Sequence, residues 1–289
     1  MIIPILTDDP GWHGEQLKQA FTLRGVETVF VSLVDCSLQM TEQLKVHIPG
    51  FTKPPPGVFV RGVTGGTLQQ VITRLNILHV LQDSGVVVYN HGRAIERTVD
   101  KAMTSVLLHR HKVATPHTWV CESRAQAQQV RRLSNEVMVL KPLFGSQGLG
   151  VRQLMPEAPL PVPMEMYVDG VYYLQQFIET SDVPHDFRLF VIGNKVVAAM
   201  KRIGDSWVNN VAAGGQCVAI EPEPAMIQLA LNAAAAVNIE YCGVDIIQAK
   251  TGEYYVLEVN SIPAWKGLQT ATQINIAQLL VDDFLSKLS

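Results

Sequence analysis

The chain carries Lys141-Pro142-Leu143-Phe144-Gly145-Ser146-Gln147-Gly148-Leu149-Gly150-Val151, a lysine that ends a predicted strand followed by a loop with three glycines. Glycine lets backbone N–H groups approach phosphate oxygens closely, and the lysine supplies a positive charge beside them. This pattern indicates phosphate binding, although the glycine loop taken alone is equally typical of a plain hairpin turn. It lacks the Gly-Lys-Ser/Thr ending of a Walker A loop, and no GxGxxG opens a helix after the first strand, so neither common nucleotide motif applies.

A second polar signal lies downstream, at the end of the predicted strand 254–260. Strict alternation along this strand would place Glu258 and Asn260 on one face together with Tyr254 and Val256. Two oxygen donors would then point in the same direction. Taken singly, each is more often a hydrogen-bonded strand residue beside a turn.

The strand before it, 243–248, carries Asp245 as the lone carboxylate in an apolar run, and a buried charge needs a partner. Together with Glu258 and Asn260 it would supply two carboxylates and an amide oxygen. Such a set suits Mg²⁺, a hard ion that takes oxygen ligands and bridges nucleotide phosphates.

Between these signals, residues 186–202 read as two strands joined by a Gly193-Asn194 turn. Asp186 and Arg188 share one strand face, and Arg202 lies at the end of the second strand. Solvated hairpin charges are the simpler interpretation of this segment when it is taken by itself.

Composition narrows the class of protein. Of 289 residues, 47% are hydrophobic and 17% are charged, as in an ordinary α/β enzyme rather than a disordered chain. The formal charge of −3 offers no basic excess for nucleic acid. No apolar run approaches the roughly 20 residues that span a bilayer, so we expect no membrane partner. Four scattered cysteines without a CxxC pair favour a reducing, cytoplasmic location.

The order of predicted elements indicates three units. A βαβ opening with strands near 28–33, 58–60 and 86–89 forms the first, residues 1–95. A small α+β unit containing the glycine loop follows at 96–170, and a strand-rich unit with an alanine-rich helix near 223–237 occupies 171–289.

Taken in order, these pieces resemble the ATP-grasp superfamily, and within it the RimK-type amino-acid ligases, over nearly the whole chain. The matching stretches are 57–61, 100–101, 141–151, 175–178, 186–202, 209–210 with 214–215, 243–245 and 258–261. Each alone is weak, but their order and spacing together are specific. The resemblance implies an α/β ATP-grasp fold, in which an N-terminal βαβ (pre-ATP-grasp) domain precedes two α+β lobes that clasp the nucleotide.

The resemblance also implies roles for individual residues. Those expected to contact the nucleotide are Lys101, Lys141, Gly145, Ser146, Gly148, Gln176, Phe177, Asp186 and Asn209. The residues expected to hold magnesium, or manganese in its place, are Asp245, Glu258 and Asn260. Those expected to take part in catalysis are Arg202, Lys141 and Asn210. The glycine loop would close over the triphosphate, Gln176 and Phe177 would meet the adenine edge, Asp186 would lie near the ribose, and Arg202 near the γ-phosphate.

The implied reaction uses ATP and Mg²⁺ to convert a small-molecule carboxylate to an acyl phosphate, which an amine then attacks to give an amide. RimK-type members usually carry arginines where this chain has Val208 and Ala213. Those arginines would serve acidic substrates, so their absence argues against glutamate as the amine donor and against a polyacidic acceptor. Glutamate or another amino acid could be added to a small molecule or coenzyme, for example a pterin-type cofactor, which fits as well as a peptide does. A non-catalytic ATP-binding protein on the same fold is the alternative, and a homodimer is a reasonable default.

Overall fold

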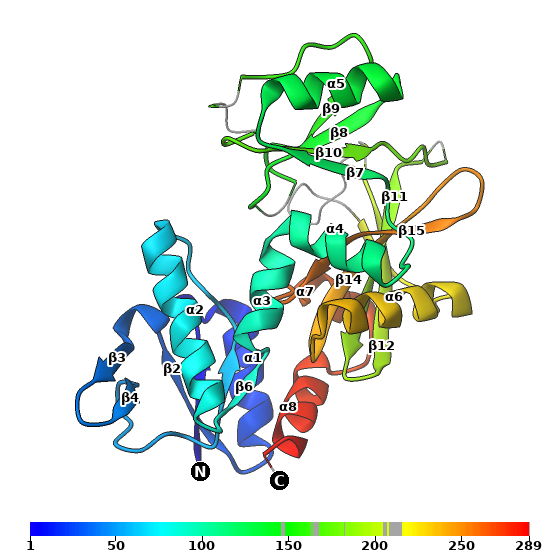
Figure 1. The fold of residues 1–289 in the computed structure, drawn as a ribbon. Helices are drawn as coiled ribbons and strands as arrows, with labels where there is room; N and C mark the ends of the chain where they lie inside the picture. Colours follow the sequence, from blue (N-terminus) through cyan, green and yellow to red (C-terminus); the bar gives the residue numbers. More distant parts are fainter. Residues whose placement is uncertain are drawn as a thin grey trace.

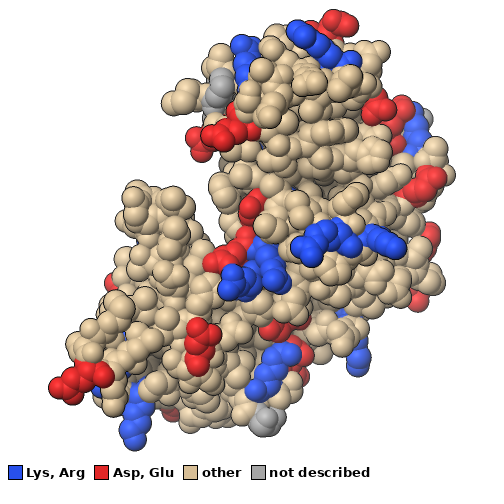
Figure 2. All heavy atoms as spheres, viewed as in Figure 1, with Lys and Arg blue, Asp and Glu red and all other residues tan. Residues whose placement is uncertain are grey.

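The computed structural model describes residues 1–145, 148–162, 164, 168–181, 183–204, 207 and 216–288. Three larger sheets and one small hairpin organise the chain, with helices against the sheet faces (Figure 1). None of the helices in the described ranges is long and apolar enough to cross a membrane. On the face drawn in Figure 2, basic and acidic side chains are interspersed, as the small net charge leads one to expect.

The N-terminal sheet is entirely parallel and has the strand order β2-β1-β5-β6. Its strands are β1 (Ile2–Leu6), β2 (Glu27–Val31), β5 (Gly57–Val60) and β6 (Val87–Tyr89). The other elements of this part are α1 (Gly11–Thr22), the 3₁₀ turn η1 (Leu33–Asp35), the hairpin β3 (Ser37–Met40) and β4 (Leu44–His47), and α2 (Leu68–Asp83). Helix α2 begins at a capping box formed by Thr67 and Gln70.

The central sheet is antiparallel and has the order β7-β10-β8-β9. Two helices, α3 (Gly92–Val99) and α4 (Lys101–Arg110), lead into it. Its elements are β7 (Thr118–Cys121), α5 (Arg124–Ser134), β8 (Met138–Lys141), β9 (Arg152–Leu154) and β10 (Tyr172–Gln176). Helix α5 packs one face of the sheet through the buried Ala127, which leaves the opposite face for the glycine loop and Lys141.

The third sheet has the order β13-β12-β11-β14-β15. Its strands are β11 (His185–Ile192), β12 (Lys195–Ile203), β13 (Gln216–Ala219), β14 (Tyr241–Gln248) and β15 (Tyr254–Asn260). The predicted hairpin is confirmed, with Gly193 and Asn194 at its turn. Helix α6 (Pro224–Val237) buries its alanines against one face of this sheet, and α7 (Lys266–Ala271) and α8 (Ile276–Ser286) end the chain.

The end of the chain returns to the N-terminal sheet. Helix α8 packs beside α1, and Phe284 lies against the rings of Phe21 and Phe59 at centroid distances of 5.7 and 5.8 Å. A Cβ on Gly57 would stand 2.9 Å from Phe284, so only glycine fits at this contact. The N-terminal and C-terminal parts therefore share one apolar core. We retain the division at residues 95 and 170 as a proposal.

The expected facing of strand β15 is wrong in one respect. The ladder pairs Asp245 with Glu258 but Ile246 with Val256, so Leu257 bulges out of register. Strict alternation would have put Val256 on the face of Glu258. Instead Val256 is fully buried in the core beneath α6, whereas both Leu257 and Glu258 line the opposite face of the sheet.

Candidate active site

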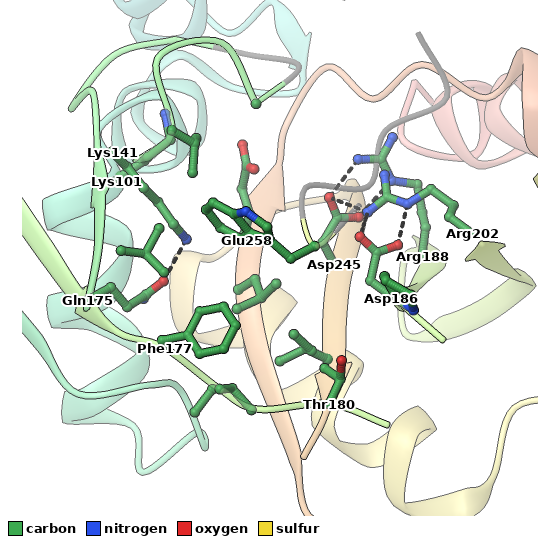
Figure 3. Close-up of a pocket in the computed structure, with 18 of the residues that line it drawn as sticks. Lys101, Lys141, Gln175, Phe177, Thr180, Asp186, Arg188, Arg202, Asp245 and Glu258 are labelled. Carbon is green, nitrogen blue, oxygen red and sulfur yellow. Dashed lines mark hydrogen bonds and ion pairs between the residues drawn. The ribbon is translucent and has the colours of Figure 1, made fainter. Parts of the chain in front are cut away.

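A cavity of about 220 Å³ lies between the central sheet and the third sheet. The predicted residues that line it are Lys101, Lys141, Gly145, Gly148, Gln176, Phe177, Asp186, Arg202, Asp245, Glu258 and Asn260. The remaining three, Ser146, Asn209 and Asn210, lie outside the described residues, as do Val208 and Ala213. Residues predicted from segments up to 160 positions apart thus meet at one site (Figure 3).

The first lysine holds the glycine loop. Lys101 begins helix α4, whose first amides are capped by the carboxylate of Asp100. Its Nζ donates to the carbonyl oxygen of Gly145 at 2.9 Å and to that of Leu143 at 3.4 Å. Burial lowers the pKa of Lys101, and the nearby carboxylate of Glu258 opposes that shift. The lysine thereby links the start of α4 to the loop that was predicted to cover phosphates.

The second lysine is positioned by a residue that sequence reasoning missed. Lys141 Nζ donates to Gln175 Oε1 at 2.5 Å, and Gln175 Nε2 donates to Thr118 Oγ1 at 3.1 Å. Burial lowers the pKa of Lys141 to about 8. Gln175 was part of a matching stretch, and the signal for its role is its place on β10, which pairs with the strand that Lys141 ends.

Four charged side chains form an ion-pair cluster at the other end of the cavity. Arg188 donates to both carboxylate oxygens of Asp245 at 2.7 Å, and Arg202 Nη2 lies 3.1 Å from the same carboxylate. Arg202 also makes a bidentate pair with Asp186, at 2.5 and 2.9 Å. Burial opposes the ionisation of Asp245, but the two guanidinium groups outweigh it and hold the pKa of Asp245 at about 2.

This cluster brings together residues that were expected to act separately, Asp186 near a ribose and Arg202 near a phosphate. Arg188 was not among the predicted site residues. The signal that could have found it is the alternation that puts Asp186 and Arg188 on one strand face, because both side chains then lie on the cavity side of the sheet, where Asp186 meets Arg202 of β12 and Arg188 meets Asp245 of β14.

Glu258 lies between the lysines and the ion-pair cluster (Figure 3). Burial and the charge of Asp245 raise the pKa of Glu258, and Lys101 and Lys141 partly offset this. Its carboxylate makes no hydrogen bond or ion pair with the described residues. Asn260, two residues on, has a buried side-chain nitrogen with no hydrogen-bond partner among the residues that the structure describes. These two side chains with Asp245 leave oxygen donors available to a hard cation. In the described part of the chain, no group of three acidic, His or Cys residues forms a metal cluster.

The rest of the cavity is apolar and has aromatic walls. The ring of Phe177 meets that of Trp207 edge to face at a centroid distance of 5.8 Å. Val139, Ile247 and Leu257 also line this region, which suits a flat base. The backbone amides of Gln176 and Phe177 are already bonded to the carbonyls of His117 and Val137, at 2.8 and 3.1 Å. A base could therefore use the carbonyls and side chains of this segment but not those amides.

Two lysines, glycines of the predicted phosphate loop, an apolar region and several oxygen donors thus line one cavity between two sheets, as the resemblance to ATP-grasp ligases predicts. Residues 98–284 match the model of the RimK-like ATP-grasp domain, and the chain belongs to this family. It is an ATP-grasp ligase of the amino-acid-ligase type.

Curated relatives agree with this assignment. A tetrahydromethanopterin:alpha-L-glutamate ligase of Methanococcus maripaludis is 34% identical, over 99% of this chain and 98% of its own length. A probable alpha-L-glutamate ligase of Vibrio vulnificus is 30% identical, over 94% of this chain and 90% of its own.

Solved structures share the fold. The ATP-grasp ligase PsnB, complexed with a minimal precursor, Mg and ADP, superposes with a TM-score of 0.76 at 18% identity, covering 100% of this chain and 97% of that one. An ATP-grasp RimK domain protein from Sphaerobacter thermophilus gives a TM-score of 0.72 at 18% identity, covering 99% and 100%. At these identities the likeness establishes the fold alone, and the predicted ATP-grasp fold is confirmed.

Proposed function

We propose that this protein is an ATP- and magnesium-dependent ligase that adds L-glutamate to a carboxylate of a pterin-type coenzyme through an acyl phosphate. The observation that carries the proposal is the full-length similarity to a tetrahydromethanopterin:alpha-L-glutamate ligase, at 34% identity. The cavity supports it, because every predicted site residue within the described ranges lines the same space.

Magnesium would be held by Asp245, Glu258 and Asn260. Bound there, the ion would neutralise charge on the nucleotide phosphates. The donor set fits, since Glu258 and Asn260 have no competing partners among the described residues and the pKa of Asp245 is low enough to keep its carboxylate charged. The ion would share the carboxylate of Asp245 with both Arg188 and Arg202.

Side chains of the protein would supply most of the electrostatic stabilisation of the reaction. The carboxylate of the acid substrate attacks the γ-phosphorus, its oxygen bonds to phosphorus, and ADP leaves. Two anions must meet in this step, so positive charge from Lys101, Lys141 and Arg202 lowers the barrier. The amine of glutamate then attacks the acyl carbon and inorganic phosphate leaves. The loop that begins at Gly145 would exclude water from the acyl phosphate.

Release of ADP with formation of the amide product tests the proposal. The purified protein, MgATP and L-glutamate are incubated with a reduced pterin acid, and the product is analysed by mass spectrometry for the gain of one glutamyl residue. Hydroxylamine in place of glutamate should trap the acyl phosphate as a hydroxamate. ATP binding without ADP release for any acid and amine pair would favour the alternative, a non-catalytic nucleotide-binding protein.

Two further expectations are kept as proposals. All four cysteines are free, which supports a reducing cytoplasmic location. A homodimer remains the default oligomeric state, to be tested by light scattering.

A further inference from the structure

We propose that Arg61, at the carboxyl end of β5, binds a second carboxylate of the acid substrate, so that the acceptor is recognised as a dicarboxylic acid. This inference rests on the proposed ligase function and adds to it a subsite outside the nucleotide cavity. It concerns the place where the N-terminal sheet meets the segment 261–265 of the C-terminal part.

Arg61 lies at the position where parallel α/β sheets usually bind ligands. Helix α1 follows β1 and packs on one face of the sheet, whereas α2 follows β5 and packs on the other. Strands β1 and β5 are neighbours, so the crossovers diverge between them, and ligands bind beyond the carboxyl ends of strands at such a switch point. The amide of Arg61 donates to the carbonyl of Leu6 at 2.8 Å, which fixes the residue at this point.

The guanidinium of Arg61 is partly buried but makes few hydrogen bonds with the described residues. Its Nη1 donates to the carbonyl of Ile262 at 3.4 Å, and its centre lies 5.2 Å above the ring of Trp265. Its Nε is buried with no hydrogen-bond partner, and its Nη2 is not buried and makes no hydrogen bond with the described residues. No carboxylate of the described residues forms an ion pair with it.

Other buried or half-buried arginines have more partners than Arg61, and even Arg131, which also has one buried nitrogen without a partner among the described residues, donates from Nη2 to two backbone carbonyls. Arg188 and Arg202 are paired with aspartates, and Arg74 donates to the carbonyls of Thr64 and Gly65 at 2.5 and 2.9 Å. Burial lowers the pKa of Arg61, which means that burial disfavours the charged form of this side chain. A partly buried cation with an unmet donor is stabilised by an anion, and guanidinium groups bind carboxylates in bidentate geometry.

Among the described residues, no neighbouring side chain neutralises the positive charge of Arg61. His13 accepts a hydrogen bond at Nε2 from the amide of Trp265 at 3.1 Å, which requires that nitrogen to be unprotonated. Burial and the charge of Arg61 lower the pKa of His13 to about 4, so the ring is neutral near pH 7. The positive charge of Arg61 is therefore left for a ligand.

Arg61 is connected to the phosphate site through the segment that follows β15. Ile262, its carbonyl partner, is two residues beyond Asn260. A Cβ on Gly243 would stand 3.1 Å from Pro263 and 3.6 Å from Arg188, so Gly243 lies between them. One carboxylate of an acid could thus react beside Arg188 and Arg202 while a second is held at Arg61. Arg61 would then supply the positive charge for an acidic substrate, which the uncharged side chains of Val208 and Ala213 cannot supply.

Hydroxamate formation on the full chain tests the subsite. Glutarate, a dicarboxylate, and butyrate, its monocarboxylate counterpart, are compared with saturating MgATP and hydroxylamine. We expect the wild type to prefer glutarate by about tenfold or more in kcat/KM, as for a hydrogen bond to a charged group. Arg61→Met should remove that preference with little change in the KM for ATP, and Arg61→Lys should restore part of it.

A matched control separates substrate binding from a merely structural contact. Arg24 on the N-terminal side makes a bidentate pair with Asp282 of α8, at 2.7 Å, on the outer surface. Arg24→Met removes a contact between the same two parts of the chain and should leave the glutarate preference intact. If Arg61→Met changes only the melting temperature, as Arg24→Met would, or changes glutarate and butyrate equally, the subsite is refuted.

The same assay distinguishes this inference from the function on which it rests. A wild type that activates a pterin acid but shows no preference for glutarate over butyrate overturns the dicarboxylate subsite alone. A wild type that activates no acid at all overturns the ligase proposal. If Arg61→Met does not fold, the Arg61→Lys variant decides, because it keeps the charge but loses the bidentate donors and should lower the preference for glutarate.

Discussion

Asp245 and Glu258 stand directly opposite each other on β14 and β15, in the last regular pair before Leu257 bulges out of the ladder. In an antiparallel pair, opposite residues share a face, so two carboxylates are forced together within one cavity. Burial raises the pKa of Glu258, the charge of Asp245 adds to that shift, and a cation between the two carboxylates would relieve their repulsion. The register of β14 and β15 therefore brings together the two carboxylates of the proposed magnesium site.

Replacing Glu258 with Gln should abolish magnesium-dependent turnover while leaving the fold intact. The amide keeps the size of the side chain but removes the charge that a hard cation requires, and we expect ADP release to fall by about two orders of magnitude or more. The metal-free variant should melt no lower than the wild type, because Gln lacks the buried charge. ADP release at wild-type rates in this variant would refute the metal assignment.

The affinity for ATP should fall as the pH rises through about 8. Burial lowers the pKa of Lys141 to about 8, so its folded-state charge is present below that pH and is lost above it. A bound phosphate favours the charged form, hence binding takes up a proton at higher pH and weakens there. Titration with an ATP analogue between pH 7 and pH 9 measures this effect.

The matched variant for this test is Lys141→Arg, whose guanidinium stays charged over the whole range. Its binding should lose the decline above pH 8 that the wild type shows, after correction for the analogue's own titration. An identical pH profile for both proteins would mean that Lys141 does not contact the phosphates.

Removal of Arg188 should destabilise the protein even without ligand. Its pair with Asp245 is largely buried, with side-chain exposures of 14% and 9%, so breaking it leaves the buried carboxylate with only the longer contact to Arg202 among the described residues. We expect Arg188→Met to cost about 3 kcal/mol in the free energy of unfolding measured with urea. Adding Asp245→Asn should recover part of that loss, because the buried charge that has lost its bidentate partner is then gone. Strictly additive losses would show that the two residues are not coupled.

The parts of the site that the sequence predicts are those set by local patterns. Lys141 ends a strand and Gly145 and Gly148 follow it, so their meeting at a loop depends only on neighbouring residues. Asp245 and Glu258 lie on adjacent strands joined by a short turn, which makes their approach predictable as well. The resemblance to a known family supplied the rest, including Lys101.

The parts of the site that the sequence does not predict depend on the strand register between segments that are distant in the chain. The bulge at Leu257 reverses the facing of Val256, and no alternation rule detects it because burial beneath α6 decides which residues turn inward. Arg188 finds Asp245 across 57 positions of sequence. Such a pairing is fixed only when β11 and β14 are placed side by side, which local periodicity does not specify.

Gln175 gives the last prediction, because it is the residue that holds Lys141 in place. Gln175 is almost fully buried, at 1% exposure, and its carbonyl accepts from the Lys141 ammonium while its amide donates to Thr118. Gln175→Leu would leave the ammonium without an acceptor and free to leave the phosphate position. We expect the KM for ATP to rise about tenfold, the equivalent of one hydrogen bond to a charged group. Ser105→Ala serves as the control, since Ser105 reaches Gln175 only indirectly in the described structure, through the hydroxyl of Tyr173 at 2.7 Å, to which Gln175 Nε2 donates at 3.4 Å, and its loss should leave KM unchanged. Equal effects of the two substitutions would assign the loss to packing around β10 rather than to the position of Lys141.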